Sequence, residues 1–555
     1  MGPEGRYHFI MMHRCMIPQG VSVSFIPLSQ IKHDRLNLIN MKRMMQLAAL
    51  GSLTLLLGAC IDPDGNDAFY ESDGEYKKVE ELKAFPTAEG FGKNATGGRG
   101  GQVVIVTNTN DDGEGSLRWA LKQYPKDFTV VFSVGGTIEL KSDLRCKAEN
   151  FTIAGQTAPG DGICITKNEL NFGGSRNFII RHLHFRGGDK KADGTPITGK
   201  IAPLRIENAD NFIVDHCSFC WAVEENADFI DTHFSTVQYC IFAEGLYQST
   251  HVKGKRGYGG VFGGTSATYH HNLFANNNSR TPLLNGARGK DPGQDLVVYL
   301  EYINNVNYNW GSKMATYGAE NESQDPAYYG YQGNFVNNYY KPGPRTKASV
   351  SDLKFFRQSG AREPQTAPAR GATKWYFNGN IMEGNPEVTN DNAKGVYAES
   401  DYLYTLDETL QQSFIQPTGQ ENRQVYWFDW QTYTLNGKYE TAEQAYESVL
   451  AGAGAFPRDK IDTRIIKEVT KGISTYGDNG IINTPEDAEG LPSYAAGKPV
   501  RDNDKDGMDD DWEKKVGLDP SNPDDRNTLT KTGYTALEVY LNSLVGEHLE
   551  HRFNR

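Results

Sequence analysis

Short apolar segments fill residues 100 to 385, and clusters of Gly and Asn separate them. Their residues are mostly β-branched or aromatic, which is typical of strands rather than helices. Residues 177–185 (NFIIRHLHF) align with residues 211–219 (NFIVDHCSF), and one apolar landmark recurs at Phe185, Phe219, Phe242, Phe274, Val306, Tyr339 and Met382. The successive gaps are 34, 23, 32, 32, 33 and 43 residues. This spacing predicts an all-β fold, a parallel β-solenoid, because a sandwich or a propeller would need hairpin turns at shorter intervals.

A column of Cys and Asn residues accompanies the repeat. The residues two positions before each landmark from Phe219 onward are Cys217, Cys240, Asn272, Asn304, Asn337 and Asn380. Equivalent positions in adjacent coils lie about 4.8 Å apart, so their amides can form hydrogen bonds along the stack. We therefore expect an Asn ladder, with Cys217 and Cys240 as stacked neighbours that form either two thiols or a disulfide.

Helical patterns return only after residue 386. Three sites carry cap residues before such a pattern: Thr441–Gln444, Asp462–Thr463 and Thr535–Glu538. We expect residues 386–500 to pack as irregular and helical structure on one flank of the solenoid. Residues 501–555 then form a separate tail with a terminal helix.

The tail begins with an acidic stretch at residues 502–513, DNDKDGMDDDWE. It meets the twelve-residue calcium-loop pattern, which predicts ligands from Asp502, Asp504, Asp506, Met508, Asp510 and Glu513. It also resembles thrombospondin type 3-like calcium repeats. So many carboxylates repel one another unless a cation lies among them, so we expect a structural Ca²⁺ site here, remote from any chemistry.

Residues 41–60 (MKRMMQLAALGSLTLLLGAC) have a basic start, an apolar stretch and small residues, in that order. This is the layout of a secretory signal, and the eleven-residue apolar run is too short to span a bilayer as a mature helix. The final LGAC resembles a lipoprotein lipobox, which predicts Cys60 as the lipidated mature N-terminus. We expect translation to start at Met41, residues 1–59 to be the signal region and residues 60–95 to form an acidic tether. The protein would be exported and lipid-anchored at the outer membrane, on its cell-surface or periplasmic face.

The amino-acid composition excludes several further classes of protein. The chain has 555 residues, of which 23% are charged, and a formal net charge of −13. Such a globular composition excludes wholesale disorder. An acidic balance without a dense basic stripe argues against a nucleic-acid partner. Only five cysteines follow Cys60, so disulfides are at most a detail of the fold.

Five motifs, in order along residues 96–385, carry a family resemblance: GGRGGQVVIVTNTNDDGEGSLRWAL, AGQTAPGDGICI, VDHCSFCWAVEEN, HVKGKRGYGGVFGG and HHNLFANNNSRTPL. Together they resemble the pectate lyase family of polysaccharide lyases, in a Bacteroidetes-type lipoprotein form. The resemblance implies a right-handed parallel β-helix, pectin lyase-like, over residues 96–385. It also implies cleavage of pectic homogalacturonan by β-elimination, in which a base removes the proton on carbon 5 and the glycosidic oxygen leaves carbon 4.

The same resemblance implies roles for basic residues. Arg280, in Ser-Arg-Thr-Pro, matches the catalytic base of the family's Arg-x-Pro motif, and Lys253, in His-Val-Lys-Gly, matches its catalytic-site lysine. An arginine can act as a base only where surrounding cations favour its neutral form. Further substrate-binding residues are expected to be His251, Lys255, Arg256 and Arg288, with Lys290 as additional positive charge.

Calcium is the cofactor that the resemblance implies at the active site. Glu224 and Asp228 match the family's Glu-x-x-x-Asp pair, with Glu225 adjacent, and carboxylate oxygens are what Ca²⁺ prefers. Residues 201–203 (IAP) replace the coil that usually adds one or two aspartates, and Asp189 is the expected substitute. Asn285 stands where a second arginine is expected, which leaves the preference for free or methyl-esterified galacturonate open. The expected partner is a pectic polysaccharide bound by a monomer that meets a membrane only through its anchor.

Two other functions remain open at this point. A β-helix glycoside hydrolase would need paired carboxylates as acid and base. Glu224, Glu225 and Asp228 could serve, but Arg280 and Lys253 would then have no role. A glycan-binding lipoprotein without activity is the second alternative. The product separates them, because only a lyase generates unsaturated, ultraviolet-absorbing sugar ends.

Overall fold

The computed structural model describes residues 82–199, 202–286, 296–311, 314–319, 328–346, 349–359, 374–398, 440–549 and 552–553. The chain divides into two units, residues 1–73 and 74–555, and the description concerns the second. The predicted signal region, Cys60, Arg288 and Lys290 lie outside the described residues. Within the described part of the chain, no helix has the length and apolar character needed to cross a membrane.

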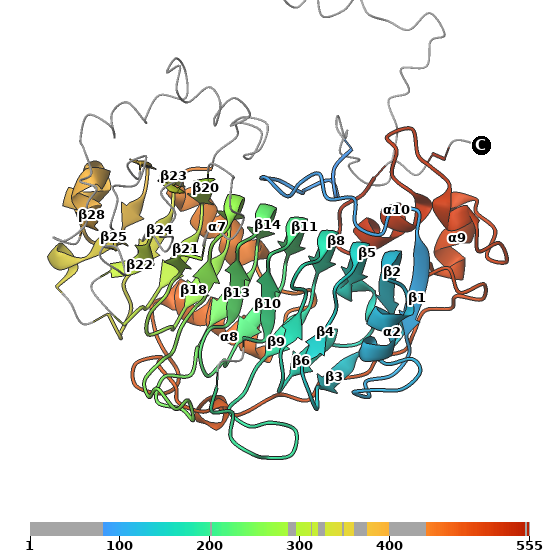
Figure 1. Cartoon of the computed structure of the whole chain (residues 1–555), viewed down its shortest axis with the longest axis horizontal. Helices are drawn as coiled ribbons and strands as arrows, with labels where there is room; N and C mark the ends of the chain where they lie inside the picture. Colours follow the sequence, from blue (N-terminus) through green and yellow to red (C-terminus); the bar gives the residue numbers. More distant parts are fainter. Residues whose placement is uncertain are drawn as a thin grey trace, which may run out of the picture. The chain divides into compact units, whose positions relative to one another are not determined.

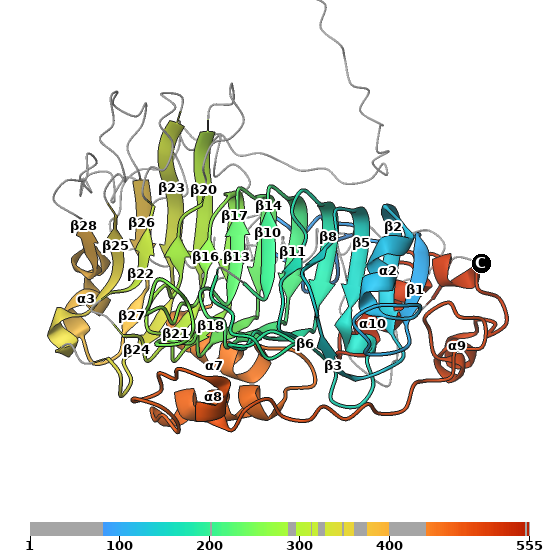
Figure 2. The ribbon, with the colours of Figure 1, turned by 60° about the horizontal axis from the view of Figure 1, so that its bottom comes forward.

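Three parallel sheets form the solenoid (Figures 1 and 2). Sheet A contains β1 (Gln102–Val106), β2 (Lys126–Phe132), β5 (Glu149–Ala154), β8 (Arg176–Arg181), β11 (Asp210–Asp215), β14 (His233–Gln238), β17 (Thr265–His270), β20 (Leu296–Ile303), β23 (Tyr328–Val336) and β26 (Lys374–Asn378). Sheet B contains β3 (Gly136–Glu139), β6 (Ile163–Thr166), β9 (His184–Arg186), β12 (Ser218–Cys220), β15 (Ile241–Ala243), β18 (Leu273–Ala275), β21 (Val306–Tyr308), β24 (Tyr339–Lys341) and β27 (Ile381–Met382). Sheet C contains β4 (Leu144–Arg145), β7 (Leu170–Asn171), β10 (Leu204–Glu207), β13 (Ala227–Ile230), β16 (Val261–Phe262), β19 (Leu283–Leu284), β22 (Met314–Gly318), β25 (Lys354–Gln358) and β28 (Val396–Ala398).

Each coil contributes one strand to each sheet, so a strand pairs with its equivalent in the next coil. This arrangement confirms the predicted right-handed parallel β-helix. The first strand begins at Gln102, and β28 pairs with β25 beyond residue 385, where the solenoid was predicted to end.

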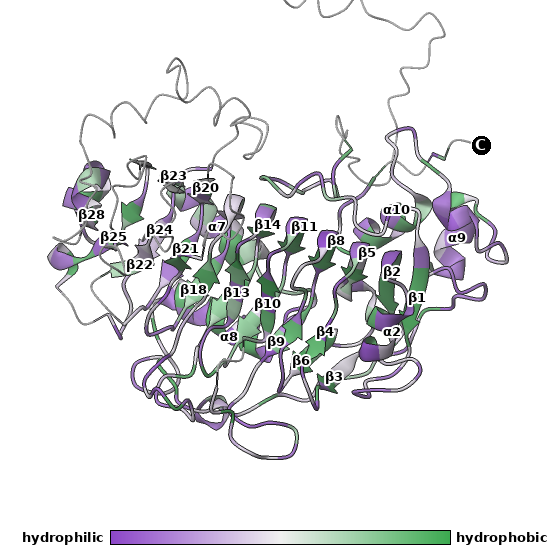
Figure 3. Cartoon of the chain, viewed as in Figure 1, coloured by the Kyte–Doolittle hydropathy of each residue, from purple (hydrophilic) through white to green (hydrophobic). Residues whose placement is uncertain are grey.

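Aromatic stacks fill the interior of the coils. Two rows of phenylalanine rings lie face to face with centroids 4.7 to 5.5 Å apart: Phe128, Phe151, Phe178 and Phe212, and Phe185, Phe219, Phe242 and Phe274. Figure 3 shows hydrophobic residues along strands such as β1, β2 and β18. Because identical rings repeat at one level of each coil, stacking fixes the register between coils.

The Asn ladder exists, but its register differs from the prediction. Its members are Asn272, Asn305, Asn338 and Asn380, and each amide donates to the next at 2.8 to 3.1 Å. The predicted members Asn304 and Asn337 lie instead at the corner between sheets A and B, with left-handed φ values of 56° and 53°. The prediction was one residue off because Asn307, not Val306, occupies the landmark position opposite Phe274.

Cys217 and Cys240 extend this ladder as thiols. Both are buried and free, and the backbone N–H of Cys217 donates to the Cys240 sulfur at 3.4 Å. Burial raises the pKa of the Cys240 thiol, which makes it a poor nucleophile. Of the two possibilities left open by the sequence, the structure has the thiol pair.

The helices outside the sheets begin at side-chain caps. They are α2 (Leu117–Gln123), α3 (Pro386–Asn390), α7 (Ala442–Gly452), α8 (Lys460–Lys471), α9 (Asp510–Val516) and α10 (Ala536–Ser543), with short 3-10 turns at 155–157, 350–352, 392–395, 485–488 and 525–527. The predicted capping boxes at Thr441 and Thr535 are confirmed. The prediction at Asp462 was wrong: Asp459 caps α8 and accepts from the Asp462 backbone N–H at 2.7 Å. α2 was not predicted, and it buries Leu117 and Leu121 in the main core.

A buried ion-pair network fixes α8 to the solenoid. The Arg186 guanidinium of β9 donates to Asp459 at 2.8 Å and to Asp462 at 2.7 Å. Ser218 of β12 also donates to Asp462, at 2.5 Å. Apolar residues of α8, including Ile465, pack against sheet B in the same region. Residues 442–471 therefore cover this flank of the solenoid.

Two segments from opposite ends of the chain cover the outer face of sheet A. The strap (residues 84–98) lies across the strands and donates backbone N–H groups to threonine hydroxyls, for example Gly92 to Thr236 at 2.8 Å. A Cβ on Gly92 would lie 2.1 Å from a backbone carbonyl, so only glycine permits this approach. The tail (residues 501–549) joins it through Glu547, which accepts from Arg181 at 2.6 Å and from the Thr87 backbone at 3.3 Å.

Candidate active site

The residues predicted for the active site gather at one corner of the solenoid, where sheet B leads into sheet C. The loop before β10 holds Asp189, the loop before β13 holds Glu224 and Glu225, and the loop before β16 holds residues 251–256. Arg280 lies in the loop before β19. Because Glu225, Tyr258 and Ser279 form consecutive parallel bridges, three successive coils are aligned at this corner. Residues up to 91 positions apart in the sequence thus share one edge.

Arg280 is half buried among acceptors and aromatic rings. Its Nη1 donates to the Glu225 carboxylate, and its guanidinium carbon lies 4.2 Å from the centre of the Tyr258 ring. Burial lowers the pKa of this guanidinium, but Glu225, with Tyr317 and Tyr258, outweighs burial and raises the pKa. Its side chain keeps 22% of its surface exposed. In this state Arg280 is a protonated donor that remains accessible from outside.

The His-Val-Lys-Gly segment places two basic groups beside the acidic ones. The His251 Nδ1 accepts from the Lys253 backbone N–H at 3.0 Å, and the His251 Nε2 lies 3.6 Å from Glu224. Burial lowers the pKa of His251, so the imidazole is neutral near pH 7. The Lys253 side chain is exposed. The Lys253 ammonium can therefore reach a ligand at this corner.

Two further cations flank the same loop. The Arg256 Nε lies 3.7 Å from Glu224, and its Nη1 donates to the Tyr258 hydroxyl at 3.2 Å. The Lys255 ammonium lies 5.5 Å from the Tyr247 ring. Tyr258 thus contacts the guanidinium groups of both Arg256 and Arg280, and the electron-rich face of a tyrosine ring attracts such cations.

The predicted calcium ligands of the solenoid are paired with cations. Glu224 faces His251 and Arg256, Glu225 accepts from Arg280, and Asp228 lies 2.9 Å from Arg205. Within the described ranges, no group of three converging ligand atoms includes these three carboxylates or Asp189. Asp189 is buried, and only its backbone carbonyl makes hydrogen bonds that the structure defines.

Asn285 does not replace the second arginine. It is 1% exposed, and its side-chain oxygen accepts from the Tyr331 hydroxyl at 3.4 Å. A side chain so buried contributes to packing between coils rather than to ligand binding. Arg288, which was expected to bind substrate, lies outside the described residues.

Three residues important for this corner were not predicted. Tyr258 contacts both arginines, and Asn226 and Asn277 form a fully buried amide network beneath the loops. Asn277 accepts from the Gly245 backbone at 2.9 Å and from Asn226 at 3.3 Å, and it donates to the Phe242 carbonyl at 2.9 Å. Its position in the run NNNS was the only available sequence signal, and Asn is common in turns.

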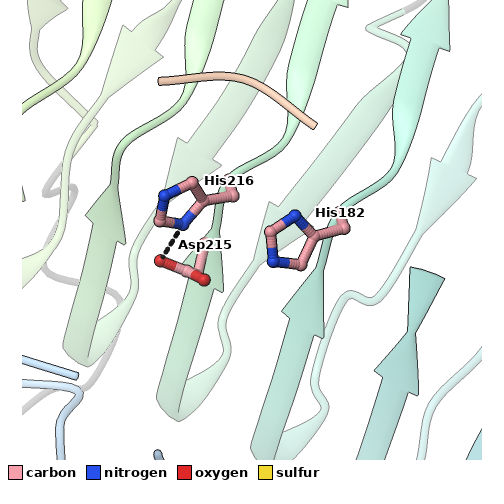
Figure 4. Close-up of side chains that lie close together, drawn as sticks. All are labelled: His182, Asp215 and His216. Carbon is pink, nitrogen blue, oxygen red and sulfur yellow. Dashed lines mark hydrogen bonds and ion pairs between the residues drawn. The ribbon is translucent and has the colours of Figure 1, made fainter. Parts of the chain in front are cut away.

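Two histidine-containing clusters elsewhere are structural. Asp215 accepts from His216 at 2.8 Å, with His182 beside them (Figure 4). Asp215 also accepts from Arg181 at 2.7 Å, and the His182 Nδ1 accepts from a backbone N–H. The second cluster, His184 with Asp459 and Asp462, contains the Arg186 guanidinium. A guanidinium already neutralises the carboxylates in each cluster, so neither is suited to a metal cation.

The acidic loop of the tail brings carboxylates together. Ligand atoms of Asp502, Asp504 and Asp506 lie within 4.8 Å of one another, and so do those of Asp506, Glu513 and Asp525. Burial and the neighbouring carboxylates raise the pKa of Asp506 to about 7 and that of Glu513 to about 8.

Two residues of this loop that were predicted as calcium ligands, Asp510 and Met508, have side chains that contact other groups. Asp510 lies outside both groups, because it accepts from Asn503 at 2.6 Å and pairs with Arg501 at 3.0 Å. The Met508 side chain packs in an apolar cluster, and its backbone N–H donates to Asp506 at 2.9 Å. Asp525, which the sequence pattern did not include, joins the carboxylates instead.

Comparison with known proteins finds several that are similar to this chain in sequence or in structure. No family model matches the chain. A protein of Emericella nidulans named "Probable pectate lyase C" is 33% identical over 475 residues, covering 84% of this chain and 94% of that protein. A "Pectate trisaccharide-lyase" of Thermotoga maritima is 25% identical over 260 residues, covering 44% and 62%. Among solved structures, jun a 1, the major allergen from cedar pollen, has 17% identity and a TM-score of 0.42, covering 66% of this chain and 92% of that one.

Proposed function

Because this chain belongs to the pectate lyase family, we propose that it cleaves pectic homogalacturonan by β-elimination and releases 4,5-unsaturated oligogalacturonides. The observation that carries the proposal is the match to pectate lyase relatives at 33% identity over 94% of a relative's length. The corner where sheet B leads into sheet C supports it, since the exposed side chains of Lys253 and Lys255 and the accessible guanidinium of Arg280 lie there. Accessible cations can bind the carboxylates of an anionic polysaccharide.

Arg280 is the proposed base for the proton on carbon 5. In the state described, its pairing with Glu225 favours the protonated guanidinium, so the pairing has to be released before Arg280 can accept a proton. Lys253, Arg256 and Lys255 then shift the protonation equilibrium of Arg280, because nearby cations favour the neutral form of its side chain. Tyr258 keeps the guanidinium in place through its ring face. The exposed Lys253 ammonium would bind a uronate carboxylate of the substrate.

The proposed cofactor is Ca²⁺, held by Glu224, Glu225 and Asp228. Their carboxylate oxygens are the ligand type that calcium prefers, and the Glu224 Oε2 is buried without a hydrogen-bond donor. When bound, the ion would neutralise the uronate carboxylate and so acidify the proton on carbon 5. Glu225 would connect calcium binding with the release of Arg280, since a carboxylate that coordinates the calcium ion no longer pairs with the guanidinium.

The test is the product formed from polygalacturonate. We expect ultraviolet-absorbing unsaturated ends that disappear with a chelator and return with calcium. Arg280→Ala and Arg280→Lys should lower kcat by about 10²–10⁴ while the variants remain folded. The control is Arg145→Ala, because Arg145 is a sheet C arginine whose side chain is 75% exposed. Reducing sugar without ultraviolet absorption would indicate hydrolysis, and binding without turnover would indicate a glycan-binding protein.

Export is the remaining part of the proposal. We infer lipidation at Cys60 and anchoring in an outer membrane from the layout of residues 41–60. The protein would act as a monomer whose acidic segment before the strap holds the solenoid away from the membrane. The predicted tether of residues 60–95 was too long, because residues 84–95 belong to the strap on sheet A. Mass spectrometry of the mature N-terminus tests this: a peptide that retains residues before Cys60 contradicts it.

A further inference from the structure

The acidic loop of the tail and a second, separate turn bring two groups of carboxylates together, and Asp506 belongs to both groups. Asp502, Asp504 and Asp506 come from the loop, Glu513 from α9, and Asp525 from the 3-10 turn at residues 525–527. Several of their oxygens have neither solvent nor hydrogen-bond donors: both of Asp504, both of Glu513, Oδ2 of Asp506 and Oδ1 of Asp525. The remaining oxygens of Asp506 and Asp525 accept from backbone N–H groups at 2.9 and 2.8 Å.

Glu513 is the observation that points to a ligand. Its side chain is completely buried, and neither carboxylate oxygen has a donor within the described structure. A buried carboxylate without a partner is strongly unfavourable in a protein interior, so it is retained where an ion completes its environment. Asp506, only 1% exposed, belongs to the same group of carboxylates.

We propose that one calcium ion binds among Asp502, Asp504, Asp506, Glu513 and Asp525, with Asp525 taking the ligand position that the linear loop pattern assigns to Asp510. The available oxygens suit calcium: two each from Asp504 and Glu513 and one each from Asp506 and Asp525 already give six, before Asp502 is counted. Calcium takes about six to eight oxygen ligands in flexible geometry, whereas magnesium keeps water in a strict octahedron.

The ion fixes the fold of the tail as well as the loop. Asp525 is twelve residues beyond Glu513. If both bind the same ion, the ion holds α9 and the 3-10 turn at residues 525–527 together and so closes the loop between them. Met508, Leu537 and Leu541 pack in one cluster with Val131 of β2. A Cβ on Gly507 would lie 3.1 Å from the Val103 side chain of β1, so the loop rests directly on the first strands. Calcium therefore attaches the tail to the first coils of the solenoid, far along the chain from Arg280.

Hydrogen exchange measured on the full chain with calcium chloride, and with a chelator, tests the proposal at residue level. Calcium should slow amide exchange in residues 502–513 and 519–527 of the wild type. Asp525→Asn should weaken the calcium concentration dependence of this protection at least about tenfold, because it removes a direct ligand. Asp524→Asn is the matched control, since Asp524 is 91% exposed beside it and should leave the dependence unchanged.

Asp510→Asn distinguishes the two ligand sets. Here we expect a smaller loss than for Asp525→Asn, because Asp510 is occupied by Arg501 and Asn503. The proposal is overturned if millimolar calcium leaves exchange in these segments unchanged, or if Asp525→Asn binds calcium as the wild type does. Since the readout is local to the tail, it is independent of lyase activity and of any calcium at Glu224, Glu225 and Asp228.

Discussion

Replacing Asn277 with Ala should reduce both stability and turnover. The change removes the acceptor of the Gly245 backbone N–H and the donor to the Phe242 carbonyl, both at 2.9 Å. Asn226 loses one acceptor but keeps its bond to the Ala243 carbonyl at 2.9 Å. Each buried group left without a partner costs about 1–3 kcal/mol, so the free energy of unfolding should fall by about 2–6 kcal/mol.

The effect on turnover follows from what the amide network supports. Asn226 and Asn277 hold the loops that present Glu225 and Arg280. A displacement of about 1 Å in a catalytic group can cost about 100-fold in rate. We therefore expect kcat on polygalacturonate to fall by about that factor, with KM changed less, at a temperature where denaturation curves show the variant to be folded.

Asn338→Ala is the matched control for this prediction. Asn338 makes equivalent bonds in the ladder, donating to the Tyr302 carbonyl and accepting from the Asn305 backbone N–H, each at 2.9 Å. It should lose comparable stability but keep kcat, because its coil does not carry the active-site loops. Equal kcat in the two variants would refute the view that the Asn277 network positions Arg280.

Three other predictions concern stability. Burial raises the pKa of Glu301 to about 8 from its ordinary 4.5. The folded state therefore holds a proton that the unfolded state releases, so the free energy of unfolding should fall as pH rises from about 4.5 to 8. Glu301→Gln should make this slope shallower by the contribution of one group in urea denaturation, because Asp506 and Glu513 contribute a slope of the same sign. Arg186→Leu should cost about 3–5 kcal/mol in the same assay, because Asp459 and Asp462 would remain buried without their cation, whereas the exposed Arg176→Leu should cost little. Dithiothreitol should leave Tm unchanged, since the five described cysteines are free thiols, and a lowered Tm would reveal a disulfide.

The solenoid could be predicted from the sequence because its coils repeat apolar positions at nearly constant spacing. The register of the ladder could not, because Asn307 occupies an interior position where apolar residues were expected. The structure accommodates this amide by pairing it with the Tyr302 hydroxyl at 2.9 Å. A buried polar group is tolerated when its partner is present, and that partner is not visible in a one-dimensional pattern.

In the candidate site, too, the sequence pattern does not show which distant residues the fold brings together. Arg280, Lys253 and Glu225 lie in local motifs, so they could be predicted as site residues without a folded structure. Asp525 meets Glu513 only through the fold of the tail. Asp459 rather than Asp462 caps α8, and Asp462 lies in the first turn, where it accepts from Arg186 and Ser218. Contacts between distant segments decided these positions, and sequence spacing carries no information about them.

The strap and the tail give the chain an order of assembly. Coils can add one after another as the polypeptide is made, since each needs only its predecessor. The strap, however, depends on Tyr534 and Glu547, which hydrogen-bond to the Lys83 and Thr87 backbones and are synthesised about 450 residues later. The part of the outer face of sheet A that the tail covers therefore stays open until the last part of the chain arrives. A chain truncated near residue 500 would have stacked coils and yet leave that face open to chaperones and proteases.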